Sequence, residues 1–465
     1  MTTAVRYVGK WWIADKVENR VGGVLEISDE GTVILEIVDE LVGDETVAII
    51  HGHAAGKEVT LVNSFKTGGK IFMGQAYTTT EVVRSQLAFV GIHLDEELDN
   101  VFSHAEVEVS CLTSFIGDTG LQYTTTFDTN TGHFKRAQLD IEVPETLIDQ
   151  AACSQQQVEI FWATESSSFE NFTYGRNIRV TESAKLRVRA SSPSSWNAFD
   201  QVIHRVQNLV TLASRQGSAV RSRKLAVIDD GRTHAVDLHF STADTWMDAK
   251  VEHHKFLFHL SDISGDLGDG LAAWFSLSEE SGIALDALFS LEYSSDTYLE
   301  NELFNLASAA EGLHAKFFPN STAHDPDVRS EIVKIAMEAF DGHAEKNWLK
   351  GILSNNRPGL KKRLVELASV PDDEAVLELL GSVDTWAKWL RDARNAVGHM
   401  NTGELERKIP ENGRYRLAYV TKALLHLVLM QRLGISAEMQ RRAVADIYGY
   451  SAHAFREAIA AASGN

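Results

Sequence analysis

The sequence predicts an α+β multidomain protein, in which a mostly antiparallel β-sandwich-like part precedes an all-α helical bundle. Three observations predict this class. The length of 465 residues exceeds what one hydrophobic core usually organises. The first 180 or so residues contain short runs of alternating apolar and polar side chains, separated by turn residues. From about residue 275 onward, apolar residues instead recur at helical spacing.

The N-terminal runs are typical of paired strands. Residues 23–38 form two alternating runs joined by Asp29-Glu30-Gly31, which is a hairpin turn signal. Residues 57–77 show a similar pattern, with Thr67-Gly68-Gly69 as the expected turn. We therefore expect a meander of short antiparallel strands with one exception, a helix near 195–214 that follows a serine cap signal.

The C-terminal part is expected to be a helical bundle. One helix is predicted over 296–318, and Asp325-Pro326 supplies an N-cap and a first-turn proline for the next. Further helices are predicted near 358–370, 382–401, 414–433 and 436–447. Residues 261–270, "SDISGDLGDG", are interpreted as a linker. The expected domains are therefore 1–265 and 275–465.

Charge and composition limit the function classes. The formal net charge of −21 repels nucleic acid overall, so any nucleic-acid site must be a local basic patch. Two cysteines give neither a disulfide framework nor a zinc pattern, which fits a reducing compartment. A secretory signal and a membrane-length apolar run are both absent from the sequence. We expect a cytoplasmic protein with no metal, no cofactor and no membrane association.

The stretch 386–400, "WAKWLRDARNAVGHM", combines an apolar stripe with a polar face. On a helix, the stripe contains Trp386, Trp389, Leu390, Ala393, Val397 and Met400. Arg391, Arg394, Asn395 and His399 fall outside it. Asn395 and His399 are four residues apart and share a face, whereas Arg394 and His399 lie on different flanks. A polar face that meets only solvent is the alternative interpretation of this pattern.

The Arg-Asn-x-x-x-His pattern at 394–399 resembles the signature of HEPN domains (higher eukaryotes and prokaryotes nucleotide-binding), small helical bundles that include metal-independent ribonucleases. The upstream segment is similar to the opening of the HEPN domain in ApeA-like anti-phage proteins, through Trp274, Phe275, Tyr293, Glu311 and His314. Residues 7–28, 49–62 and 199–214 resemble the β-rich part of the same family. The resemblance therefore covers nearly the whole chain.

The resemblance implies an endoribonuclease in which the RNA 2′-OH attacks the neighbouring phosphorus without a metal. In that reaction His399 would act as general acid/base, Arg394 would stabilise the transition state and Asn395 would orient the phosphate or the imidazole. Arg391 is a candidate phosphate contact. Glu311 is a candidate support for Arg394 or His399, and a solvated glutamate remains the alternative.

The resemblance also implies a biological role and partners. It predicts abortive infection, in which the N-terminal domain senses a phage-derived trigger and releases cleavage of RNA, with transfer RNA as a candidate substrate. HEPN sites typically form where two domains meet, which predicts a homodimer or a higher homo-oligomer. A non-catalytic HEPN module that binds nucleotide or protein is the alternative function.

Overall fold

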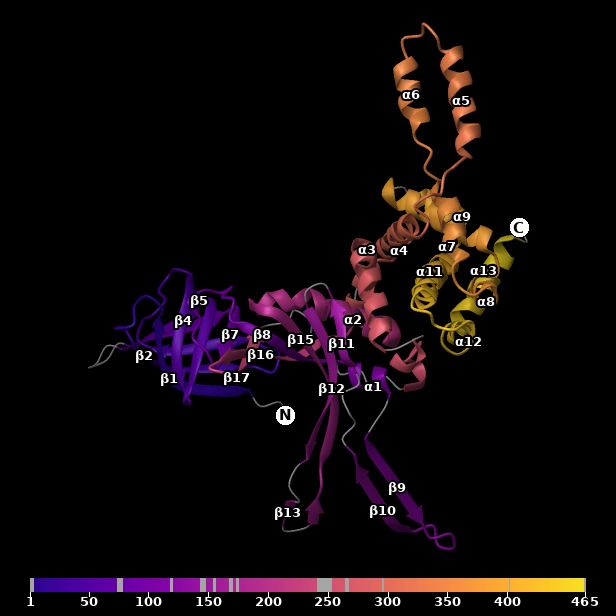
Figure 1. The fold of residues 1–465 in the computed structure, drawn as a ribbon. Coiled ribbons are helices and arrows are strands. Elements are labelled where there is room, and N and C mark those ends of the chain that lie inside the picture. The colour runs from indigo at the N-terminus through magenta and orange to yellow at the C-terminus, as the bar shows by residue number, and fades with distance from the viewer. Residues whose placement is uncertain are drawn as a thin grey trace. The chain divides into compact units, whose positions relative to one another are not determined.

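The computed structural model describes residues 4–72, 78–117, 120–142, 148–153, 156–166, 170–172, 175–240, 253–263, 267–294, 297–400 and 402–463. Its internal contacts divide the chain into two compact units. The N-terminal unit comprises Met1–Val210, Ser218–His253 and Leu267–Ala272. The helical unit comprises Thr211–Gly217, His254–Asp266 and Ala273–Asn465. The predicted α+β organisation, with strands first and helices after them, is confirmed (Figure 1).

The N-terminal unit is built mainly from antiparallel strands. Its described strands are β1 (Val5–Ile13), β2 (Val21–Ile27), β3 (Val33–Val38), β4 (Val47–Ala54), β5 (Lys57–Phe72), β6 (Thr78–Ser85), β7 (Leu87–Val90), β8 (Phe102–Val109), β9 (Leu121–Phe127), β10 (Phe134–Ile141), β11 (Ile148–Cys153), β12 (Gln156–Ser166), β13 (Glu170–Phe172), β14 (Gly175–Asn177), β15 (Val180–Ser194), β16 (Val220–Asp229) and β17 (Arg232–Phe240). Its helices are α1 (Leu112–Ile116) and most of α2 (Asp200–Ser214), which a 3₁₀ turn at Trp196–Phe199 precedes. The helix expected near 195–214 is therefore confirmed.

Thirteen of the described strands share one sheet, in the order β11-β12-β15-β8-β16-β17-β7-β5-β4-β1-β2-β3-β6. Strand β6 also pairs with β5, so the last six strands close into a ring. Alternate residues of these strands point into the ring, as Val33, Leu35 and Ile37 of β3 show by being buried. Trp11 and Leu25 are fully buried in the same cluster, which forms the core of the ring.

The turn expected at Thr67-Gly68-Gly69 is wrong, because β5 runs through it as one strand of 16 residues. Its first half pairs with β4 and its second half with β6, with a bulge between Lys66 and Gly68. A Cβ on Gly69 would stand 2.4 Å from the Thr80 carbonyl oxygen, so only glycine fits there. The glycines therefore bend a strand that closes the ring. The sequence instead predicts that the strand ends at these glycines.

The helical unit contains a bundle and a separate helix pair, α5 (Pro326–Ala339) and α6 (Lys346–Ser354), which pack against each other. Its other helices are α3 (Leu267–Tyr293, shared with the N-terminal unit over its first residues), α4 (Leu299–Phe317), α7 (Leu360–Ala368), α8 (Asp373–Leu380), α9 (Val383–Gly398), α10 (Thr402–Lys408), α11 (Glu411–Arg432), α12 (Ala437–Arg442), a π-helical turn at Ala443–Tyr448 and α13 (Gly449–Ser463). The Asp325 carboxylate caps α5 by accepting from the Asp327 and Val328 N–H groups, as predicted.

Two features of this unit bear on the sequence predictions. Residues 267–270 of the expected linker form the first turn of α3, while residues 264–266 lie outside the described part of the chain. Residues 423–430 of α11 are all buried, so this helix forms the centre of the bundle. Among the helices that the structure describes, none has the length and apolar character needed to cross a membrane.

Candidate active site

Helix α9 holds the candidate catalytic residues on a firmly anchored scaffold. The Ser382 hydroxyl caps its first turn by accepting from the Thr385 N–H at 3.2 Å. Trp386, Leu390 and Ala393 are fully buried on the inner face. The Trp386 indole N–H donates to the Thr421 hydroxyl of α11 at 2.9 Å, which satisfies its only polar atom inside the core. The rotation of α9, and with it the direction of its outer face, is thereby set.

The last turn of α9 places His399 at the helix end. The helix stops at Gly398, and the His399 N–H bonds to the Asn395 carbonyl at 3.0 Å. Met400 has a φ of 53°, in the left-handed region, and is 93% exposed. Its expected place on the apolar stripe is therefore wrong, because the helix has already ended. His399 is exposed at this terminus.

Arg394 and Glu311 form an ion pair between α9 and α4. Arg394 Nη2 lies 3.6 Å from Glu311 Oε2, and Arg363 Nη1 of α7 lies 3.3 Å from Glu311 Oε1. One carboxylate therefore contacts two guanidinium groups from two other helices. About a quarter of the Glu311 side chain is exposed, against 38% of Arg394, so the cluster sits at the surface of the bundle.

Phe304, two turns before Glu311 on α4, fixes the other side of the Arg394 guanidinium. The Arg394 Cζ lies 5.8 Å from the centroid of the Phe304 ring. Among the described residues, the Arg394 Nε is buried without a hydrogen-bond partner. Arg394 thus has a fixed direction while part of its hydrogen-bonding capacity stays unused.

Asn395 and His399 are both exposed, and Figure 1 locates their helix, α9, in the helical unit. Within the described residues, neither side chain has a hydrogen-bond or ion-pair partner. The described residues of one chain also show no direct contact between the side chains of Arg394 and His399. The structure therefore brings Arg394 and Glu311 together, and it leaves the polar side chains of Asn395 and His399 open to a ligand.

Arg391 has a structural partner. Its Nη2 and Nε donate to the Asp392 Oδ1 at 2.7 and 2.9 Å, and Lys408 of α10 approaches the same oxygen at 3.9 Å. The Asp392 side chain is only 7% exposed. A buried carboxylate needs a nearby positive charge, and Arg391 supplies that charge to Asp392. Any contact of Arg391 with a ligand would be a second role.

His314 lies one turn after Glu311 on α4 and is buried in contact with a carboxylate of α7. His314 is 2% exposed and its Nε2 lies 2.7 Å from Glu366 Oε2 of α7. The Ser321 hydroxyl donates to the same oxygen at 2.7 Å. Burial raises the pKa of the Glu366 carboxyl, but the bonds from Ser321 and His314 hold its pKa below the ordinary value.

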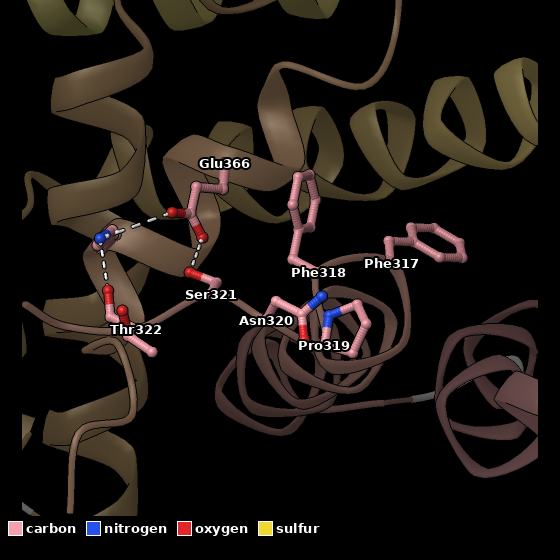
Figure 2. A pocket seen from close by; sticks show the side chains of 8 residues that line it. Phe317, Phe318, Pro319, Asn320, Ser321, Thr322 and Glu366 are labelled. Atoms are coloured by element: carbon pink, nitrogen blue, oxygen red, sulfur yellow. Dashed lines mark hydrogen bonds and ion pairs between the residues drawn. The ribbon is translucent and has the colours of Figure 1, made fainter. Parts of the chain in front are cut away.

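Figure 2 shows the shallow pocket beside this cluster, at the C-terminal end of α4. Its volume is about 430 Å³, and Phe317, Phe318, Ser321, Lys362 and Glu366 are among its lining residues. Lys362 donates to the Thr322 carbonyl at 2.6 Å. The pocket therefore adjoins the pair formed by His314 and Glu366.

Sequence reasoning did not identify Phe304, Arg363 or Glu366. Arg363 belongs to the basic run Lys361-Lys362-Arg363, the one signal that could have drawn attention to α7. Its pairing with Glu311 depends on how α7 packs against α4, which spacing along the sequence does not reveal.

A helical bundle with an Arg-Asn-x-x-x-His sequence at the end of a surface helix defines the class of the C-terminal region. Residues 304–439 match the family described as "Apea-like HEPN", so this region is a HEPN domain. Residues 6–274, more than half of the chain, match "ApeA N-terminal domain 1". The chain therefore belongs to the ApeA family and is an anti-phage, HEPN-containing protein. Searches of curated proteins and of solved structures returned no match.

Proposed function

We propose that this protein is a metal-independent endoribonuclease of abortive infection, whose HEPN domain cuts RNA under the control of the N-terminal unit. The observation that carries the proposal is the placement of Arg394 and His399. A guanidinium held by Glu311 lies in the last turns of α9, and an exposed imidazole lies on the residue that directly follows the helix. HEPN domains are generally nucleases and commonly bind RNA, which supports the assignment.

The proposed reaction needs only groups that this chain supplies. The RNA 2′-OH attacks the adjacent phosphorus, the bond to the 5′-oxygen breaks, and a 2′,3′-cyclic phosphate and a 5′-hydroxyl result. An imidazole can take the proton from the 2′-OH or return one to the leaving oxygen, and His399 is the exposed candidate. Arg394 stabilises the charge on the phosphoryl oxygens, and Asn395 orients the phosphate.

Local cations offset the acidic body of the protein. Helices α7 and α9 carry Lys361, Lys362, Arg363, Lys388, Arg391 and Arg394. All of these except Lys388 also lie within 4 Å of a carboxylate oxygen, so a phosphate would share them with the protein's own acidic groups. Screening limits the field of the −21 net charge to about 10 Å, so this local group can hold a phosphate backbone. Transfer RNA, as a structured and abundant RNA, is the proposed substrate.

Association of two chains completes the proposed site. Arg394 and His399 lie on different flanks of α9, and the described residues show no direct link between them. A second HEPN domain related by two-fold symmetry brings its own Arg394 and His399 to a shared groove. We propose a homodimer on this ground, with a phage-derived trigger acting through the N-terminal unit.

The test is cleavage of total RNA by purified protein in EDTA, with and without extract from phage-infected cells as the source of the trigger. The proposal expects cleavage by wild type that Arg394→Ala and His399→Ala abolish. Cleavage that appears only with added Mg²⁺ contradicts it. Intact RNA under every condition, combined with tight binding of nucleotide or protein, would instead establish the non-catalytic module.

A further inference from the structure

Strands β9 and β10 form a ribbon that pairs with no other described strand. Their register runs from Leu121 opposite Ile141 to Phe127 opposite Phe134. The connecting turn is ordered by Asp128, whose Oδ1 accepts from the Asn130 and Thr131 N–H groups at 2.9 Å. The backbone N–H of Thr131 in particular holds the pKa of the Asp128 carboxyl below its ordinary value. The ribbon is therefore a defined element with a fixed register.

The register separates the ribbon into one apolar and one polar face, because opposite residues of antiparallel strands point the same way. On the polar face, Arg136 donates to Gln138 at 2.9 Å and Gln138 donates to Asp140 at 2.9 Å. The other face, called here the ribbon face, carries Leu121, Tyr123, Thr125, Phe127, Phe134, Ala137, Leu139 and Ile141. All eight of these side chains are uncharged.

The ribbon face is open within the part of the chain that the structure describes. Tyr123 is 67% exposed, Phe134 62%, Phe127 57%, Ile141 47% and Leu139 42%. With about 150–250 Å² for a large aromatic side chain, this leaves on the order of 500 Å² of apolar surface uncovered. An isolated two-stranded ribbon is marginal in water, and an apolar patch of this size is often a functional surface.

We propose that the ribbon face docks on the same face of a second copy of this chain. Two copies would bury roughly 1,000 Å² in total, which reaches the lower limit for a specific interface. An approaching copy carries a net charge of −21, so contact requires a surface that adds no like charges, and the ribbon face meets this requirement. This surface belongs to the N-terminal unit and is separate from the association proposed for the HEPN domain.

The distribution of side-chain sizes fits a two-fold arrangement. Aromatic rings lie at the turn end, where Phe127 and Phe134 contact each other edge to face at 6.2 Å. Aliphatic side chains, Leu121 and Ile141, lie at the opposite end. An antiparallel stack of two ribbon faces places the rings of one copy over the aliphatic end of the other. Thr125, near the middle, then lies next to its own copy across the axis.

Cross-linking of the full chain tests this geometry. Thr125→Cys is expected to give covalent dimers with a short bismaleimide, because the two introduced thiols meet at the axis. Thr124 is also exposed, on the opposite face, so Thr124→Cys is the matched control. Wild type measures the background from native thiols, of which Cys111 has a pKa raised by burial. Equal or absent cross-linking of the two variants overturns the proposal.

Two solution measurements separate a second copy from another partner or another interface. In sedimentation equilibrium, Tyr123→Ser combined with Phe134→Ser should halve the molar mass of the wild-type assembly, which for a dimer gives the 51.4 kDa of one chain. Thr124→Ser combined with Gln138→Ser should leave the molar mass unchanged. The mass is halved when the ribbon contact joins a different pair of chains from the HEPN contact. If one pair of chains uses both contacts, the double variant keeps its mass but loses the cross-link through Thr125→Cys. Raising NaCl from about 50 to about 500 mM should strengthen the contact by screening two like-charged bodies. An unchanged mass together with an unchanged Thr125→Cys cross-link in the Tyr123→Ser, Phe134→Ser background, or a contact that salt weakens, contradicts the proposal.

Discussion

Glu311 and Arg394 face each other from two different helices, with 3.6 Å between the carboxylate oxygen and the guanidinium nitrogen. Arg363 contacts the other oxygen of the same carboxylate at 3.3 Å. Glu311 therefore acts through Arg394, as a positioning residue. It also keeps two neighbouring guanidinium groups from repelling each other.

Glu311→Gln is expected to lower the rate of RNA cleavage by about 10- to 100-fold, because a misdirected guanidinium loses transition-state stabilisation. The free energy of unfolding should change by less than about 1 kcal/mol, since the ion pair is partly exposed. Single-turnover kinetics and thermal unfolding measure the two effects. Glu331→Gln, an exposed glutamate on α5, is the control, and an equal rate for both variants would refute a positioning role.

His399→Ala should reduce cleavage by about 10²- to 10⁴-fold, which is the usual contribution of a general acid or base. Its Tm should match that of wild type, because the ring is exposed and makes no hydrogen bond within the described residues. His453→Ala removes another exposed histidine, on α13, and should leave the rate unchanged. If His453→Ala is as defective as His399→Ala, the role assigned to His399 is wrong.

Arg391→Ala should mainly affect stability. It removes the two hydrogen bonds to the buried Asp392 and is expected to cost about 1–3 kcal/mol. The loss should shrink when Asp392→Asn is added, because the unpaired carboxylate is then gone. Denaturant unfolding of the two single variants and the double variant measures this coupling, and additive losses would show that the contact is not energetically significant.

The stability of the helical unit should depend on His426. Burial, followed by the charges of Lys422 and Arg215, holds the pKa of His426 well below its ordinary value. The ring therefore stays neutral in the folded state but takes up a proton in the unfolded state below about pH 6.5, so stability falls as the pH drops through that value. His426→Gln cannot titrate. It also loses the contact between His426 and the Tyr448 hydroxyl.

Thermal unfolding at different pH values tests this linkage. Wild type should be the more stable protein at about pH 8, and its advantage in Tm over His426→Gln should narrow toward about pH 5.5. The comparison with the variant removes the contributions of His93, His104 and His239, whose pKa values are also lowered by burial. A constant or widening gap would contradict the assignment.

Local patterns in the sequence predicted what depends on local physics. The burial of Trp386 and Leu390, the cap at Asp325 and the strand-to-helix change follow from periodicity and capping chemistry. Met400 lies outside the predicted apolar stripe, because periodicity does not mark where a helix ends. The glycines at 68–69 lie inside a bent strand and not in the predicted turn, because both kinds of structure use the same residue types.

The contacts around Glu311 could not be predicted from the sequence, because they depend on how separate helices pack together. Arg394 could be selected from a short pattern and from resemblance, but its contacts with Glu311 and Phe304 come from the packing of α9 against α4. Arg363 reaches Glu311 only because α7 packs against α4, although α5 and α6 separate these two helices in the sequence. Such contacts between distant segments are not encoded in the spacing of any one segment.

The chemical identity of the RNA ends is the most direct test of the central claim. RNA cut by wild-type protein in EDTA should carry 2′,3′-cyclic phosphate and 5′-hydroxyl termini, and Arg394→Ala and His399→Ala should each suppress these termini. Termini with a 5′-phosphate and a 3′-hydroxyl, or cyclic phosphate ends that persist in both variants, would contradict attack by the 2′-OH with these two residues as its catalysts.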